Sequence, residues 1–134
     1  MKPFSFGKAE RLKSRKTIDA LFADRRSIVQ LPLRVKYGFS PLLENTVPVQ
    51  AGMSVSKKAF KRAVDRNRLK RQLREAYRLQ KKALVQTLEQ RKFHASLFFM
   101  YTDKVPLPFA VIYAAMGACL QQLEQKALIH ENAN

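Results

Sequence analysis

The most unusual stretch of the chain runs from Lys57 to Arg78 and reads KKAFKRAVDRNRLKRQLREAYR. Between Lys57 and Lys82, 12 Lys or Arg against 2 acidic residues leave a local charge of +10, out of a formal net charge of +16 for all 134 residues. Charge this concentrated repels itself in a free monomer. It indicates a polyanionic partner, for which a phosphate backbone is the usual candidate.

The same stretch has the periodicity of a two-sided helix, predicted from about Arg62 to Gln90. On a wheel of about 100° per residue, Leu69, Leu73 and Tyr77 fall on one side and Asn67 falls on the other. The apolar side is expected to pack on a sheet, so that the other side faces outward. A ladder of cations shares the outward side with Asn67: Lys70, Arg71, Arg74, Arg78 and Lys81.

The cation ladder has an alternative explanation, a solvated helix face, but such faces usually interleave Glu for pairing one turn away. Only Glu75 interrupts this ladder, and Arg, the better bidentate phosphate ligand, outnumbers Lys between Arg62 and Arg78. Asp65 is the expected N-cap. The run 66–68, Arg-Asn-Arg, then lies at the positive end of the helix dipole, where anions bind. Asn67 would read a base edge or a 2′-hydroxyl, or order the two arginines.

The remaining pattern predicts one domain over residues 1–134, with a basic irregular arm over 1–12 and a frayed tail over 129–134. Ser14 is the expected cap of a helix that runs to about Arg26. Residues 27–30, 33–39, 49–56 and 97–101 are typical of strands, and a second amphipathic helix follows Pro108. The order α-β-β-β-α-β-α predicts an α+β sandwich with one mixed sheet.

Composition argues against several classes of protein. A hydrophobic fraction of 46% is too high for a disordered basic tail. The longest apolar run, residues 109–116, is too short to span a membrane. The start of the chain has no apolar signal segment, and the single Cys119 fits a reducing compartment, so we expect a cytoplasmic protein. Because the 10 acidic residues are scattered and His94 and His130 stand alone, we expect no catalytic side chain and no metal site in the protein.

The chain strongly resembles the bacterial ribonuclease P protein component over two runs, VSKK at 55–58 and AVDRNRLKRQLREAYR at 63–78. The link between the runs departs from the family, because Phe60 stands where Gly is usual and the link is one residue longer. The predicted order of helices and strands also matches the family, so the resemblance covers nearly the whole chain.

The resemblance implies a four-stranded mixed sheet with three helices and a left-handed βαβ crossover, against the usual right-handed rule. It also implies the accessory protein subunit of ribonuclease P, an RNA-catalysed endoribonuclease that removes the 5′ leader of precursor tRNA. Mg²⁺ would be held mainly by the catalytic RNA subunit, and no protein partner would be required.

Two groups of site residues follow from the resemblance. The catalytic RNA would be bound by Lys57, Lys58, Arg62, Arg66, Asn67, Arg68, Lys70, Arg71, Arg74 and Arg78. A cleft between the first helix and the sheet would hold the single-stranded leader. Its expected residues are Arg11, Ile18, Phe22, Lys36 and Tyr37, with Phe22 as the best candidate for base stacking.

Three other functions fit the charge less well. The main alternative is a ribosomal or ribosome-assembly protein that binds rRNA without a role in cleavage. An architectural DNA-binding protein is disfavoured because the sequence has no helix-turn-helix or dimer signature. A membrane-surface protein is disfavoured because the basic helix is expected to use its apolar side against a sheet.

Overall fold

The computed structural model describes residues 6–130 of the chain. This part contains nine helices and strands. The predicted α+β class is confirmed, with four α-helices where three were expected. The elements are the 3₁₀ helix η1 (Lys8–Glu10), α1 (Arg15–Ala23), β1 (Ser27–Gln30), β2 (Leu33–Pro41), β3 (Val49–Val55), α2 (Ala63–Gln80), α3 (Lys82–Arg91), β4 (Phe93–Tyr101) and α4 (Phe109–Ile129).

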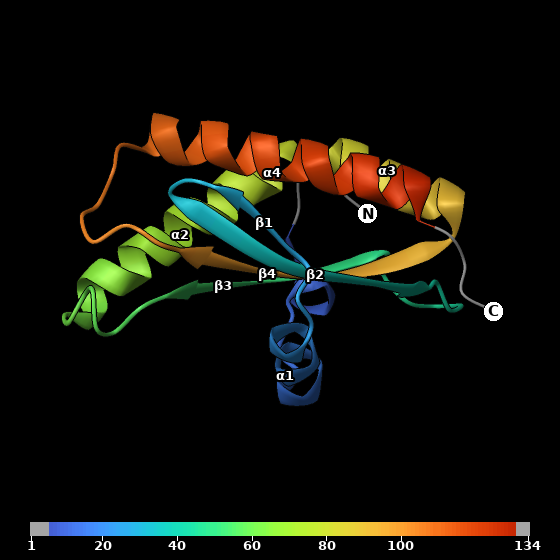
Figure 1. Ribbon diagram of the computed structural model, residues 1–134, viewed down its shortest axis with the longest axis horizontal. Coiled ribbons are helices and arrows are strands. Elements are labelled where there is room, and N and C mark those ends of the chain that lie inside the picture. The colour runs from blue at the N-terminus through green and yellow to red at the C-terminus, as the bar shows by residue number, and fades with distance from the viewer. Residues whose placement is uncertain (1–5, 131–134) are drawn as a thin grey trace.

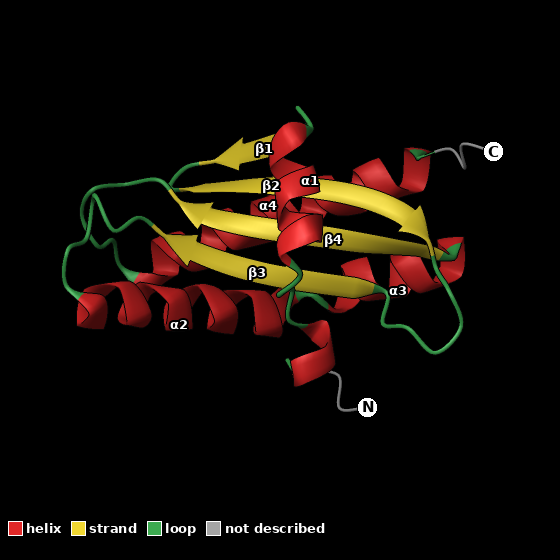
Figure 2. Ribbon diagram, turned by 90° about the horizontal axis from the view of Figure 1, so that it is seen from below, coloured by secondary structure: helices red, strands yellow, loops and turns green. Residues whose placement is uncertain are grey.

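The four strands form one mixed sheet in the order β1-β2-β4-β3. β3 and β4 run parallel, and the other two pairs are antiparallel. The connection from β3 through α2 and α3 to β4 passes over one face of the sheet and is left-handed, as expected (Figures 1 and 2). This connection brings the basic helix alongside the sheet. The position of the helix is therefore fixed by the core.

One face of the sheet is covered by α2, α3 and α4 (Figure 1). Alternate residues of β2 point into this core, where Leu33 and Val35 are fully buried. The predicted apolar side of the basic helix packs into the same core against β3 and α4, where Leu69, Leu73 and Tyr77 of α2 have almost no exposed surface. A period of two along the strands and 3.6 along α2 therefore produces one shared core.

On the other face, α1 lies across the strands (Figure 2). Ser14 caps this helix as predicted, because its hydroxyl accepts a hydrogen bond from the Thr17 N–H at 3.2 Å. Leu21 is buried against the sheet, and a Cβ at Gly38 would lie only 3.3 Å from its side chain. Gly38 thus lets α1 pack closely on β2. The helix divides this face of the sheet into two flanks.

The predicted long helix over residues 62–90 is in fact two helices that meet at Lys81. Lys81 keeps dihedral angles in the helical region, φ −76° and ψ −15°, so the chain bends there without a loop. The Lys81 side chain is buried and forms an ion pair with Glu10. The prediction that Lys81 faces outward with the ladder is therefore wrong, because the bend turns this side chain into the protein.

The N-terminal segment is also more ordered than the predicted irregular arm over residues 1–12. Within residues 6–12, η1 buries Glu10, and Leu12 is buried with its N–H bonded to the Ala51 carbonyl at 3.0 Å. Residues 1–5 lie outside the described part. At the other end, α4 continues to Ile129 and the His130 ring packs against Phe93. The first two residues of the predicted frayed tail therefore belong to the packed structure, and residues 131–134 lie outside the described part.

Candidate nucleic-acid interface

The outward side of α2 presents an exposed row of polar and cationic side chains. Asn67, Arg68, Arg71 and Arg74 are exposed, and Lys70 is half-buried. They recur at three- and four-residue spacing on the side opposite the buried Leu69 and Leu73. The predicted ladder is thus present on α2, shortened by the loss of Lys81 at its far end.

The carboxylates within this helix do little to neutralise the row. Asp65 lies 4.0 Å from Arg62, and Glu75 pairs with Arg78 at 2.9 Å. The Arg78 guanidinium lowers the pKa of Glu75 through this hydrogen bond, so the carboxylate stays ionised. Both acidic groups are matched to cations at the two ends of the helix, which leaves the central Arg and Lys residues as excess positive charge.

Arg66 has a different role from its neighbour Arg68. Its guanidinium donates hydrogen bonds to the carbonyls of Phe60 at 2.8 Å and Lys61 at 2.9 Å. Arg66 therefore holds the link that leads into α2. The prediction that Asp65 is the N-cap is wrong. Arg62 occupies that position, and Asp65 lies in the first turn of α2.

The unusual Phe60 explains how the longer link is accommodated. Its side chain is buried, and its ring lies 5.9 Å from the Tyr101 ring at the end of β4. The Ser56 hydroxyl accepts hydrogen bonds from the N–H groups of Lys58 and Ala59. The link is thus anchored at both ends, and Lys57 and Lys58 are exposed beside α2.

A second polar surface lies beside α1 on the open face of the sheet. Phe22 is 50% exposed, and its ring meets that of Phe98 edge-on at 5.5 Å. Lys36 is opposite Phe98 in the β2–β4 register and donates a hydrogen bond to the Asp24 carbonyl at the end of α1. Ile18 is half-buried on the same helix. The structure therefore brings together Ile18, Phe22 and Lys36 from the predicted cleft.

Two residues predicted for this cleft are elsewhere. Tyr37 is buried in the core, because neighbouring residues of a strand point to opposite faces and Lys36 occupies the open one. Arg11 precedes α1, and its guanidinium lies 5.6 Å from the centre of the Phe6 ring, which in turn packs against Tyr77 of α2. Arg11 therefore belongs to the N-terminal segment beside β3.

Two further residues lie on the open face, Phe98 and Arg34, which the predicted cleft did not include. Arg34 is exposed and opposite Met100 in the register. The alternation of β2 already placed Arg34 on the side of Lys36. For Phe98, consecutive aromatic residues in a strand must point to opposite faces, so one of Phe98 and Phe99 had to leave the core. The sequence could not say which one.

Asp24 and Arg26 form a local pair at the end of α1. The Arg26 side chain and N–H donate hydrogen bonds to the carboxylate, with the shortest at 2.9 Å, and hold the pKa of Asp24 at about 2. Asp24 is therefore ionised at neutral pH, and its charge is matched by Arg26 and by the nearby Lys36. The surface beside Phe22 thus keeps its positive character.

Two observations concern metal binding and nucleophilic chemistry in the described residues. They contain no cluster of three or more His, Cys, Asp or Glu side chains that could hold a metal ion. Burial raises the pKa of the Cys119 thiol to about 12, so it is a poor nucleophile at neutral pH. Among helices of the described part, none combines the length and apolar character that crossing a membrane requires.

Comparisons of this sequence with a family model and with known proteins identify the same family. The family model described as ribonuclease P matches residues 6–124. The ribonuclease P protein component of Porphyromonas gingivalis (strain W83) is 40% identical over 119 residues, which cover 87% of this chain and 85% of that protein. The protein of the same name from Chlorobaculum tepidum is 55% identical over 42 residues, 31% of this chain and 27% of its own length.

A solved structure shares the fold. The RNase P protein of Staphylococcus aureus superposes with a TM-score of 0.62 at 19% sequence identity, covering 86% of this chain and 95% of that one. At this identity, the match supports the architecture alone.

Proposed function

The chain belongs to the ribonuclease P protein component family, and we propose that it binds the catalytic RNA of ribonuclease P and the 5′ leader of precursor tRNA. The observation that carries the proposal is the exposed cation row of α2, which coincides with the run 63–78 that resembles the family signature. Each arginine offers a fork of N–H donors that suits a phosphate, so a row of arginines suits an RNA backbone better than a single small anion.

The two surfaces suit different parts of an RNA complex. The α2 row, centred on Arg68 and Arg71, offers many cations and few flat apolar groups, which suits a folded RNA backbone. The surface beside α1 pairs the exposed ring of Phe22 with Lys36, which suits an unpaired base next to its phosphate. We assign the first to the catalytic RNA and the second to the leader.

The protein's contribution under this proposal is binding, orientation and charge neutralisation. Mg²⁺ would supply Lewis-acid and nucleophile chemistry from sites held mainly by the RNA. The donor set agrees with this division, because the described residues contain no group of three or more His, Cys, Asp or Glu side chains that could hold a metal ion. The cation row would lower the repulsion between catalytic RNA and substrate, and so reduce the Mg²⁺ concentration that the complex needs.

Reconstitution tests the proposal directly. We expect the purified protein alone to leave precursor tRNA intact, and we expect its addition to the matching catalytic RNA to allow 5′ cleavage at lower Mg²⁺ than the RNA alone requires. Cleavage is measured on gels across a Mg²⁺ series. Efficient cleavage by the isolated protein would contradict the accessory role. Tight binding to rRNA with no effect on the reconstituted reaction would favour a ribosomal function instead.

Phe22→Ala should weaken the binding of precursor tRNA only when the substrate retains its leader. The exposed ring meets the Phe98 ring edge-on, and its loss should remove base stacking worth about 1–3 kcal/mol, or about 5- to 150-fold in Kd, from leadered RNA. Leu21→Ala is the matched control, because it truncates the neighbouring buried side chain. Equal losses for leadered and leaderless RNA from Phe22→Ala would indicate that the ring only packs α1 onto the sheet.

A further inference from the structure

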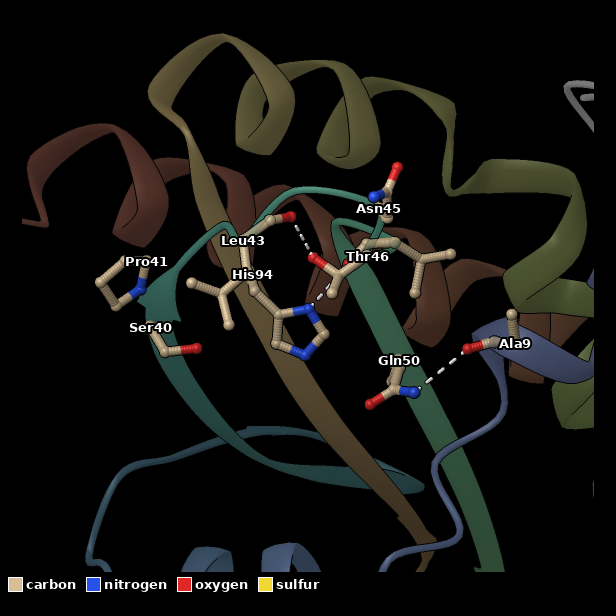
Figure 3. Close-up of a pocket in the computed structure, with 9 residues that line it drawn as sticks. Ala9, Ser40, Pro41, Leu43, Asn45, Thr46, Gln50 and His94 are labelled. Atoms are coloured by element: carbon tan, nitrogen blue, oxygen red, sulfur yellow. Dashed lines mark hydrogen bonds between the residues drawn. The ribbon is translucent and has the colours of Figure 1, made fainter.

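A cavity of about 440 Å³ opens at the end of the sheet away from α2's first turn, beneath the loop between β2 and β3 (Figure 3). Its polar floor comes from Ser40, His94 and Gln50 on three neighbouring strands. In the register, Ser40 is opposite His94 and Gln50 is opposite Ser96. These side chains therefore share the open face of the sheet with α1, on the flank that Phe22 does not occupy.

The His94 ring is fixed in one tautomer. Its Nδ1 lies 2.8 Å from the Val47 carbonyl oxygen. A carbonyl oxygen can only accept a hydrogen bond, so Nδ1 must carry the proton, and the neutral ring presents Nε2 as an acceptor. The contact of Nε2 with the Ser96 hydroxyl is 3.4 Å, longer than a good hydrogen bond. Nε2 can therefore accept a shorter bond from a bound molecule.

The Gln50 amide is fixed in the same way. Its Nε2 donates a hydrogen bond to the Ala9 carbonyl at 3.1 Å (Figure 3), which orients the NH₂ group toward Ala9 and leaves Oε1 as the free acceptor of this amide. His94 and Gln50 thus supply two acceptors whose orientation is set before anything binds. Such preorganisation reduces the entropic cost of binding.

The wall of the cavity is apolar and held in shape. Leu43, Pro41 and Val47 line it, and Leu43 is largely exposed. The Leu43 carbonyl accepts a hydrogen bond from the Thr46 hydroxyl at 2.5 Å, which closes the loop on itself. None of the residues that line the cavity in the described part is Lys or Arg. A flat group with hydrogen-bond donors fits this lining better than a phosphate does.

We propose that this cavity binds one unpaired nucleobase that carries an amino group, namely guanine, adenine or cytosine. An amino group donates to the acceptors of His94 and Gln50, whereas uracil offers a single N–H between two carbonyls that would oppose them. The inference rests on the proposed function, since RNA bound to the protein supplies the base. Its source is either the precursor leader or the catalytic RNA, and the chemistry is the same for both.

Titration of the whole protein with the four ribonucleoside monophosphates tests the cavity by itself. NMR signals of the His94 ring should shift with GMP, AMP and CMP, and UMP should bind about tenfold more weakly, as expected for one lost and one opposed hydrogen bond. His94→Phe should abolish this discrimination, and so should Gln50→Met, which provides a second variant if the first folds poorly. His130→Phe is the matched control, because this other His packs between Phe39 and Phe93.

Several outcomes would overturn the inference. These are equal binding of UMP, unchanged discrimination in both His94→Phe and Gln50→Met, the same signal shifts with inorganic phosphate alone, or no binding of any nucleotide. With RNA, a loss in His94→Phe that depends on leader sequence identifies the leader as the source, and a loss with catalytic RNA alone identifies that subunit. If nucleotides bind selectively but the catalytic RNA does not bind, the cavity stands and the proposed function fails.

Discussion

Lys81→Met should lower the free energy of unfolding by about 3–5 kcal/mol, the usual cost of removing one partner of a buried ion pair. The Lys81 ammonium is paired with the Glu10 carboxylate, and both side chains are almost fully buried. Among the described residues, the carboxylate would then keep the hydrogen bond from the Gly7 N–H at 3.1 Å but no partner of opposite charge. Chemical denaturation followed by circular dichroism measures the loss.

The double variant Glu10→Gln with Lys81→Met should recover much of this loss, because a neutral amide in an apolar site costs less than an unpaired charge. Glu75→Gln is the matched control, since it breaks an ion pair of α2 that is exposed and should change stability by less than about 1 kcal/mol. If Lys81→Met and Glu75→Gln had similar effects, the pair at Glu10 would contribute no more than a surface salt bridge.

The Glu10–Lys81 pair is also a feature that the sequence pattern did not predict. The periodicity of Leu69, Leu73 and Tyr77 correctly predicted the packing side of the basic helix. The bend at Lys81 has no such signal, because residues 79–83 contain neither Gly nor Pro. A partner 71 positions earlier in the chain turns Lys81 inward, and wheels that treat one helix at a time cannot represent such long-range pairing.

The candidate site was also predicted only in part. Residue type and local spacing identified the exposed Arg68 and Arg71 and the exposed ring of Phe22. Tyr37 and Lys36 are neighbours in one strand and must point to opposite faces of the sheet, so the predicted cleft could contain only one of them. The cavity at His94 was invisible, since His94 and Gln50 become neighbours only through the β3–β4 pairing.

Arg68→Gln combined with Arg71→Gln should weaken binding of the catalytic RNA by about a hundredfold or more. Hydrogen bonds to charged groups contribute about 1.5–3 kcal/mol each, and 1.4 kcal/mol corresponds to a factor of ten. The logarithm of the association constant should also fall less steeply with the logarithm of salt concentration, by about 1–2 in slope, because two fewer phosphates are neutralised. Filter binding over a salt series measures both quantities.

The choice of Arg71 over Arg66 follows from the structure, because Arg66 holds the carbonyls of Phe60 and Lys61 and its loss would disturb the link into α2. Lys104→Gln combined with Lys126→Gln is the matched control, which removes the same charge from exposed positions off α2. Equal losses from the two pairs would mean that net charge alone attracts the RNA. No loss from the α2 pair would mean that the row is a solvated face. A loss confined to the α2 pair requires phosphates held at defined positions along the helix, which nonspecific attraction by a basic protein cannot produce.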